Sequence, residues 1–220
     1  MFGSLRALYQ SALTPLAKVL LRVGLSPSGV TVLGTAGVLA SALWFIPRGH
    51  LVTGSLVVLV FLLGDGLDGT MARLSGRTTR FGAFLDSTLD RLADAAVFVA
   101  IAWWCLRVGD TTAAGLSAAV LVLGFLVSYA RARAEVEGWD ASVGIFERSD
   151  RLVVALVGLL AVGAGAPGVV LTVALGVVAV GSAVTVAQRV AAAHHASRED
   201  GWDKMSGGGA GPAHQPHRDL

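Results

Sequence analysis

The feature that most constrains this chain is a set of long segments without a charged side chain. None of Asp, Glu, Lys or Arg occurs in residues 23–47, 49–64, 111–130 or 152–188. A helix needs about 20 mostly apolar residues to cross the hydrocarbon core of a bilayer. Only 15% of all residues are charged, whereas about a quarter are charged in soluble domains. The sequence therefore predicts an all-α integral membrane protein that crosses the bilayer several times.

Six transmembrane helices follow from the positions at which charges, prolines and glycines interrupt the apolar sequence. We expect them at about 28–47, 51–74, 82–106, 111–134, 147–163 and 168–193. Residues 152–188 would form a single helix roughly 55 Å long, nearly twice the thickness of a bilayer core. The glycines and the proline at 163–168 therefore predict a turn between the last two helices.

Two end segments differ from the six-helix domain that we expect at residues 25–195. In residues 1–24, apolar side chains recur at near-helical spacing with polar ones between them, which predicts an amphipathic helix in the membrane interface. Residues 196–220 are polar and contain the sequence Ser-Gly-Gly-Gly-Ala-Gly-Pro. Such a segment buries too little apolar surface to fold, so we expect a disordered tail.

The basic residues predict how the chain is oriented in the membrane. Most arginines near helix ends fall in the N-terminal helix, in residues 75–81, in residues 131–151 and after the last span. Because cytoplasmic connections carry an excess of Lys and Arg, both termini should face the cytoplasm. The net charge of +2 is small and scattered, so nothing predicts a nucleic-acid partner.

Five aspartates lie in two adjoining predicted spans, where acidic side chains are costly and indicate function. Asp65 and Asp68 are three residues apart and share one helix face. Asp86, Asp90 and Asp94 are each four residues apart and share another. Because the connection between the two helices is short, their carboxylates can meet near the cytoplasmic end. Clustered carboxylates repel unless they are neutralised, and oxygen ligands without His or Cys favour Mg²⁺ or Mn²⁺.

Ion pairing and ion transport are the two alternatives to metal binding by these aspartates. For ion pairing, the candidate partners are Arg73, Arg77, Arg80 and Arg91. Asp94 is the aspartate for which we most expect such a pair. A cation transporter or channel would instead use the carboxylates as an ion pathway. Such a pathway requires acidic residues on several helices, whereas here they crowd into two.

The sequence from Asp65 to Asp90 resembles the signature of the CDP-alcohol phosphotransferase family. It reads Asp-Gly-Leu-Asp-Gly-Thr-Met-Ala-Arg at 65–73 and Gly-Ala-Phe-Leu-Asp-Ser-Thr-Leu-Asp at 82–90. Members of this family transfer a phosphatidyl group from a CDP-linked lipid to an alcohol and release CMP. The resemblance implies two Mg²⁺ ions, with Mn²⁺ as an alternative, held by Asp65, Asp68, Asp86 and Asp90. It also implies that Asp90 is the general base.

The same resemblance implies a binding site for the CDP-lipid. Its residues are Ser28, Gly29, Val30, Thr31, Gly69, Arg73 and Thr79. Gly69 would let the pyrophosphate approach the helix backbone closely, and Arg73 would offer two parallel donors to a phosphate. Helix capping after Pro27 accounts for Ser28 and Thr31 about as well.

Residues 129–135 and 147–151 resemble those of one group in this family, the actinobacterial phosphatidylinositol phosphate synthases. The implied ligands of the acceptor phosphate are Arg131, Arg151 and Arg189, with Arg133 and Arg148 as weaker candidates. The position of Arg131 is often lysine in that group. Anchoring to lipid headgroups is the alternative role for these arginines.

The resemblance implies an activity, a location and a set of partners. We expect transfer from CDP-diacylglycerol to inositol 1-phosphate (1D-myo-inositol 3-phosphate), giving phosphatidylinositol phosphate and CMP. Glycerol 3-phosphate carries the same dianion, so a phosphatidylglycerophosphate synthase is the alternative. The implied partners are CDP-diacylglycerol, a phosphorylated polyol, the lipid bilayer and a second copy of the chain. The homodimer would lie in the plasma membrane with its active site facing the cytoplasm.

Overall fold

The structure is a computed structural model that describes residues 13–64, 66–76 and 78–205. Within these residues it consists of helices and connections, without a strand. The elements in chain order are α2 (Pro27–Phe45), the short 3₁₀ helix η1 (Ile46–Arg48), α3 (Leu51–Gly64), α4 (Gly66–Ser75), α5 (Arg80–Arg107), α6 (Thr111–Val136), α7 (Arg148–Gly163) and α8 (Val169–Met205). Residues 13–22 form a further helix ahead of α2. The expected all-α fold is confirmed.

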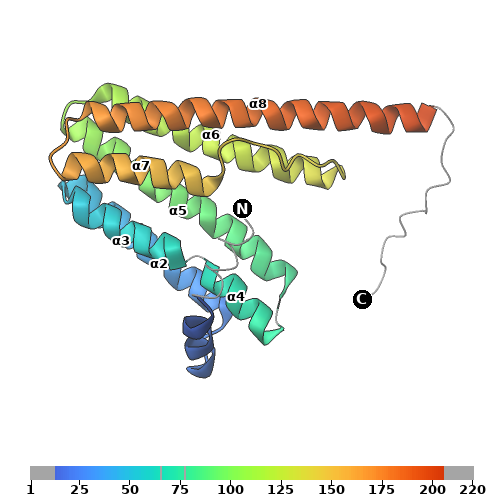
Figure 1. Cartoon of the computed structure of the whole chain (residues 1–220), viewed down its shortest axis with the longest axis horizontal. Helices are drawn as coiled ribbons and strands as arrows, with labels where there is room; N and C mark the ends of the chain where they lie inside the picture. Colours follow the sequence, from blue (N-terminus) through green and yellow to red (C-terminus); the bar gives the residue numbers. More distant parts are fainter. Residues whose placement is uncertain (1–12, 65, 77, 206–220) are drawn as a thin grey trace.

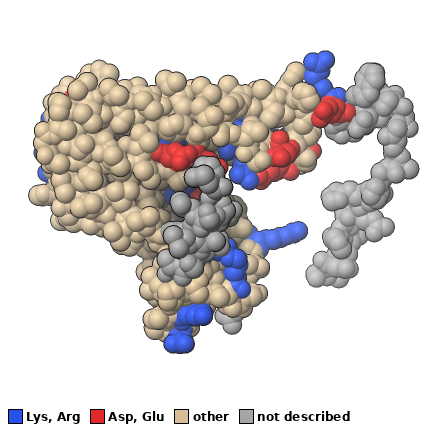
Figure 2. Space-filling model, in the orientation of Figure 1, with Lys and Arg blue, Asp and Glu red and all other residues tan. Residues whose placement is uncertain are grey.

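The helix α5 passes through the middle of the bundle. It packs against α2 on one side and α6 on the other, while α7 lies against α3 and α8. Figure 1 shows the connections around residues 46–50, 108–110 and 164–168 together at one end of the bundle (left in the view). Toward the other end, α6 and α8 diverge from α4 and α5. On the face drawn in Figure 2, charged side chains gather in this diverging part and are few elsewhere.

Apolar packing holds the helices together at the end where they converge. Val97 and Ile101 of α5 are fully buried in one cluster with Leu156 of α7 and Leu175 of α8. Glycines allow close approach between these helices. A Cβ added at Gly158 of α7, for example, would lie 2.8 Å from the Cβ of an alanine on α8.

Four helices are long and apolar enough to cross a membrane, within the residues that the structure describes. They are Pro27–Arg48, Leu51–Ser75, Thr111–Val136 and Val169–Glu199. The other two predicted spans are present as helices at the expected places. Of these, α5 contains several charged residues between Arg80 and Asp94 and ends at Arg107, and α7 has only 16 residues. A count of six spans therefore remains a prediction.

The structure differs from the expected helix ends at one place. The second predicted span, 51–74, corresponds to α3 and α4, which flank residue 65, outside the described residues, and together form the candidate span Leu51–Ser75. The last span is predicted to end near Ala193, but α8 continues to Met205 and so includes the start of the predicted disordered tail. His195 and Glu199, four residues apart and 3.5 Å from each other, support these extra turns. Residues 206–220 lie outside the described part of the chain.

The N-terminal helix packs onto α4. Ala17 is fully buried in one cluster with Leu67 and Met71 of α4, while Lys18 and Arg22 are exposed. This is the amphipathic arrangement that the sequence predicts for residues 1–24, of which 1–12 lie outside the described residues. Its location in the membrane interface remains a prediction.

Gly163, the last residue of α7, allows a test of the close packing between α3 and α7. An added Cβ would lie 2.9 Å from the backbone nitrogen of Val52 and 2.8 Å from the Cβ of Leu51. Because neither atom is the flexible end of a side chain, we expect Gly163→Ala to destabilise the fold by about 1–3 kcal/mol. The measurement is the thermal unfolding temperature in detergent.

Gly115→Ala is the matched control, because no atom of the described residues lies within 4 Å of an added Cβ at this position on α6. We expect this variant to unfold at the same temperature as the unmodified protein or slightly higher, since alanine favours helix. If the two variants unfold at the same temperature, the close contact between α3 and α7 is not formed in the protein.

Candidate functional site

Three of the predicted aspartates surround two adjoining cavities near the start of α2. Asp68 is in the first turn of α4, and Asp86 and Asp90 are one turn apart on α5. Asp68 and Asp86 line a cavity of about 250 Å³. Asp68 and Asp90 line a second cavity, of about 370 Å³. Thr31 and Asp68 belong to both cavities, so Asp68 shares one cavity with Asp86 and the other with Asp90.

Hydrogen bonds fix the carboxylate of Asp68. The hydroxyl of Thr31 donates to Oδ2 at 2.5 Å, and the backbone N–H of Gly69 donates to Oδ1 at 2.5 Å. Because Thr31 is on α2, the first of these bonds also joins α2 to α4.

Most of the residues implied in CDP-lipid binding line the smaller cavity. They are Ser28, Thr31, Gly69, Arg73 and Thr79. Val30 lines the larger cavity instead, and Gly29 donates its backbone N–H to Ser26 at 3.1 Å. Capping does not account for Ser28, because Ser26 is the N-cap of α2. Thr79 does serve as a cap, at the start of α5.

The predicted metal site is only partly within the described residues, because Asp65 lies outside them. In residues 13–64, 66–76 and 78–205, no three His, Cys, Asp or Glu side chains form a group that could hold a metal ion. The donors that line the two cavities are nevertheless carboxylates, the ligands that Mg²⁺ and Mn²⁺ prefer. They fit such ions in chemical kind, and the complete set of ligands remains a prediction.

A network of aspartates on α5 and arginines at the start of α7 connects these two helices. Arg148 contacts Asp90 with Nη1 at 2.8 Å from Oδ1, and its Nε lies 2.9 Å from Oδ1 of Asp94. The other oxygen of Asp94 lies 3.7 Å from Nη2 of Arg151. The expected ion pair of Asp94 is confirmed, but its partners are not the arginines considered from the sequence. Sequence reasoning missed this network because Arg148 is 54 residues from Asp94.

The three arginines implied in acceptor binding come from α6, α7 and α8 and differ in their surroundings. Arg131 is exposed and pairs with a glutamate one turn later on α6 at 2.8 Å. Arg189 is buried and donates to the backbone carbonyls of Val143 and Val127, at 2.9 and 2.6 Å. The charges of Arg131 and Arg151 both act on Arg189. Arg131 and Arg151 are therefore each within electrostatic range of Arg189.

Arg151 is the least accessible of these arginines, with 1% of its side chain exposed. Its guanidinium packs against α6, where a Cβ added at Gly124 would lie 3.3 Å from Nε. Nε and Nη1 have no hydrogen-bond partner among the described residues. The void beside them measures about 10 Å³, room for about one water molecule. Arg151 would have to move to contact a sugar phosphate, whereas Arg131 and Arg133, both exposed, would not.

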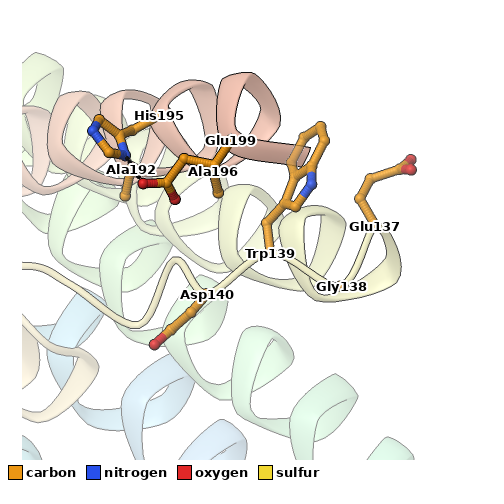
Figure 3. A pocket seen from close by; sticks show the side chains of 8 residues that line it. All are labelled: Glu137, Gly138, Trp139, Asp140, Ala192, His195, Ala196 and Glu199. Atoms are coloured by element: carbon orange, nitrogen blue, oxygen red, sulfur yellow. Dashed lines mark ion pairs between the residues drawn. The ribbon is translucent and has the colours of Figure 1, made fainter. Parts of the chain in front are cut away.

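A separate hollow of about 590 Å³ lies between the connection after α6 and the last turns of α8 (Figure 3). His195 and Glu199 lie side by side on α8, and Asp140 points away from them. Hydrogen bonds from Ser142 hold the pKa of the Asp140 carboxyl below its usual value. None of the predicted site residues lines this hollow, so it is not part of the aspartate site.

Residues 25–180 match the CDP-alcohol phosphatidyltransferase family. The chain belongs to this family. It is 48% identical to the phosphatidylinositol phosphate synthase of Streptomyces avermitilis, over 88% of this chain and 82% of that protein. It is 42% identical to the phosphatidylinositol phosphate synthase of Mycobacteroides abscessus, over 84% of each chain.

The fold is similar to that of a solved member of this family, the phosphatidylinositol phosphate synthase of Mycobacterium tuberculosis with CDP-DAG bound. The TM-score is 0.79 at 41% identity, and the match covers 82% of this chain and 92% of that one. A structure of the same synthase in complex with manganese and citrate gives a TM-score of 0.78. Family membership and the apolar helices together make this chain a membrane protein and an enzyme of the CDP-alcohol phosphatidyltransferase type.

The hydrogen bond from Thr31 to Asp68 provides a test of the metal site. Thr31→Val keeps the shape of the side chain but removes the donor that orients Asp68. We expect the affinity of the purified protein for Mn²⁺ to fall about tenfold, measured from the electron paramagnetic resonance signal of the free ion. Thr53→Val, at an exposed position on α3, is the control and should bind Mn²⁺ normally. Normal binding by Thr31→Val would mean that Asp68 is not a ligand.

Proposed function

We propose that this protein transfers the phosphatidyl group of CDP-diacylglycerol to inositol 1-phosphate, giving phosphatidylinositol phosphate and CMP. The observation that carries the proposal is the pair of cavities that share Asp68. One has the chemistry to bind a nucleotide and the other the chemistry to bind acyl chains. The names of the similar family members support the same activity.

The two cavities match the two ends of a CDP-linked lipid. Hydroxyl, guanidinium and carboxylate groups line the 250 Å³ cavity, among them those of Ser28, Arg73 and Asp86. The 370 Å³ cavity is lined mainly by apolar side chains of the N-terminal helix, α2 and α3, including Leu20 and Phe61. A lipid with its cytidine end in the first and its acyl chains in the second would place the pyrophosphate beside Asp68.

Asp65, Asp68, Asp86 and Asp90 are the proposed ligands of two Mg²⁺ ions, with Mn²⁺ as the alternative. Such ions would neutralise the pyrophosphate and stabilise the charge that develops on CMP as it leaves. The solved manganese complex of a similar family member supports a divalent metal. Asp68 is fixed for this role by its two hydrogen bonds.

Asp90 is the proposed general base. It faces the larger cavity next to Asp68, so it is close to the place proposed for the pyrophosphate. A carboxylate within hydrogen-bond reach of the acceptor hydroxyl can take its proton as the new bond to phosphorus forms. Arg73, which lines the smaller cavity, would donate to a phosphate of the CDP group.

The acceptor phosphate is proposed to bind to arginines of α6, α7 and α8. Arg131 is exposed and ready to contact it, and Arg189 and Arg151 lie deeper in the same part of the molecule. Arg189 and the two arginines within electrostatic range of it would suit a phosphate dianion. Arg133, like Arg131, is exposed on α6 and pairs with a glutamate one turn later, and it is the weaker candidate.

The orientation that we propose has both termini, the active site and the arginine-rich connections in the cytoplasm, with six spans in the plasma membrane. The aspartate cavities are lined by residues of α2, α4 and the first half of α5, and the start of α5 lies at the opposite end of the bundle from the connections around residues 46–50 and 108–110 (Figure 1). We also propose a homodimer, because glycine and alanine are frequent in the spans and permit close packing between helices.

An acceptor screen tests the proposed activity. Purified protein with CDP-diacylglycerol and Mg²⁺ would be offered inositol 1-phosphate, inositol, glycerol 3-phosphate or serine in parallel reactions. We expect metal-dependent release of CMP and a lipid product with inositol 1-phosphate at a rate at least about tenfold above the others, since the site is built for a phosphorylated polyol. A higher rate with glycerol 3-phosphate would contradict the proposal and favour a phosphatidylglycerophosphate synthase.

Asp90→Asn is the matched variant for this screen, because it keeps the size of the side chain and removes the proposed base. We expect it to insert into the membrane normally and to release no measurable CMP with any acceptor. Near-normal turnover would exclude Asp90 as the base.

A further inference from the structure

Asp94 is an aspartate for which the proposed reaction has no direct use. It is buried on α5, one turn after Asp90, and lies outside the sequence that matches the family signature. It does not line either of the two cavities. A buried carboxylate is costly even when it is paired, so stability alone is a poor reason for a charge at this position.

The contacts of Asp94 connect it to Asp90 through one arginine. Arg148 places Nε 2.9 Å from Oδ1 of Asp94 and Nη1 2.8 Å from Oδ1 of Asp90. Its Nη2 also lies 3.5 Å from the backbone carbonyl of Asp90. A guanidinium is planar and rigid, so a contact at Nε fixes the direction of the other two nitrogens. The position of the Asp90 carboxylate therefore depends in part on the contact between Arg148 and Asp94, beside the pair that Arg91 forms with its other oxygen at 3.7 Å.

Arg148 itself needs such an anchor. It is the first residue of α7, and a long side chain at a helix terminus loses considerable conformational freedom when it is held in one orientation. Arg148 also lines the larger cavity beside Asp68 and Asp90, and 23% of its side chain is exposed. Its Nε donates a hydrogen bond to Oδ1 of Asp94, which does not line that cavity.

We propose that Asp94 and Arg148 are positioning residues for the transfer reaction. Asp94 fixes the guanidinium of Arg148, and Arg148 fixes the carboxylate that takes the proton from the acceptor. The inference rests on the proposed function, in which Asp90 is the base. It also gives Arg148 a role different from binding the acceptor phosphate, because Nε and Nη1 are both engaged with carboxylates. A general base must be held within narrow limits of distance and angle to act efficiently.

Steady-state kinetics of three variants test this inference. Asp94→Asn removes the anchoring charge, Arg148→Lys keeps the positive charge but has one nitrogen in place of three, and the third variant combines both changes. We expect each single variant to lower kcat about 10- to 100-fold. The KM values for CDP-diacylglycerol and for the acceptor should stay within about twofold of normal, because substrate binding is not involved.

The combined variant distinguishes an effect of Asp94 that acts through Arg148 from two independent effects of these residues on kcat. If Asp94 acts through Arg148, kcat of the combined variant should lie within about threefold of that of the more impaired single variant. The unfolding temperatures of the same proteins in EDTA give a readout without catalysis or metal, and the two substitutions should be non-additive there too. Glu199→Gln is the control: it removes a carboxylate from a contact with His195 on the exposed end of α8 and should change neither kcat nor KM.

Any of three results would overturn the inference. The first is a kcat of Arg148→Lys within about twofold of normal. The second is a combined variant whose fold-loss in kcat equals the product of the losses of the two single variants. The third is an effect on the KM for the acceptor with kcat unchanged. If Asp94→Asn does not fold, Arg148→Lys decides the question through the split between kcat and KM. Failure of the proposed function would look different: the unmodified protein would release no CMP with inositol 1-phosphate, while the unfolding temperatures would still report on the contact between Asp94 and Arg148.

Discussion

Negative charge on α4 and α5 must be compensated inside a bundle whose outer surface is largely apolar. The carboxylates concerned are those of Asp68, Asp86, Asp90 and Asp94. Burying a carboxylate costs several kcal/mol unless a partner compensates for the lost hydration. Arg148 forms ion pairs with Asp90 and Asp94, and Asp68 accepts hydrogen bonds from Thr31 and from a backbone N–H. These polar contacts join α2, α4, α5 and α7 at one end of the bundle, whereas apolar packing joins the helices at the other end.

The proposed reaction site lies where the polar end of the bundle meets the apolar end. Asp68 belongs both to a cavity rich in polar groups and to one lined mainly by apolar side chains. A CDP-linked lipid has the same division within one molecule, and its reactive pyrophosphate lies at the junction. The diverging ends of α6 and α8 carry arginines on the other side of the site, where a water-soluble acceptor could approach. The proposed reaction thus joins a lipid and a polar substrate at the place where the bundle changes from apolar to polar.

Regular patterns along the chain were sufficient to predict most of the helices and the aspartates that line the two cavities. Charge-free segments are long only where a helix is surrounded by lipid or by other apolar helices, so they located most of the helices, though not the end of α8. Asp86 and Asp90 share a helix face whatever the tertiary structure is, because their four-residue spacing fixes it. The sequence could not reveal that Arg148 would pair with both Asp90 and Asp94, since contacts between distant helices depend on how these helices pack.

Other details also depended on packing or on local geometry. Whether Ser26 or Ser28 caps α2 is decided by where the first helical turn begins, and both residues are good caps. The burial of Arg151 against α6 depends on the space left by Gly124, which the spacing of charges does not reveal. The end of α8 was placed too early, because residues after Ala193 are polar and yet compatible with helix.

The most direct test of the central claim is to locate bound metal by anomalous scattering from crystals grown with Mn²⁺. The account predicts two manganese peaks between α4 and α5, each within coordinating distance of the carboxylates of Asp68, Asp86 or Asp90. Absence of manganese from this place at saturating concentration, or manganese bound only elsewhere, for example in the hollow between Trp139 and Glu199, would contradict it.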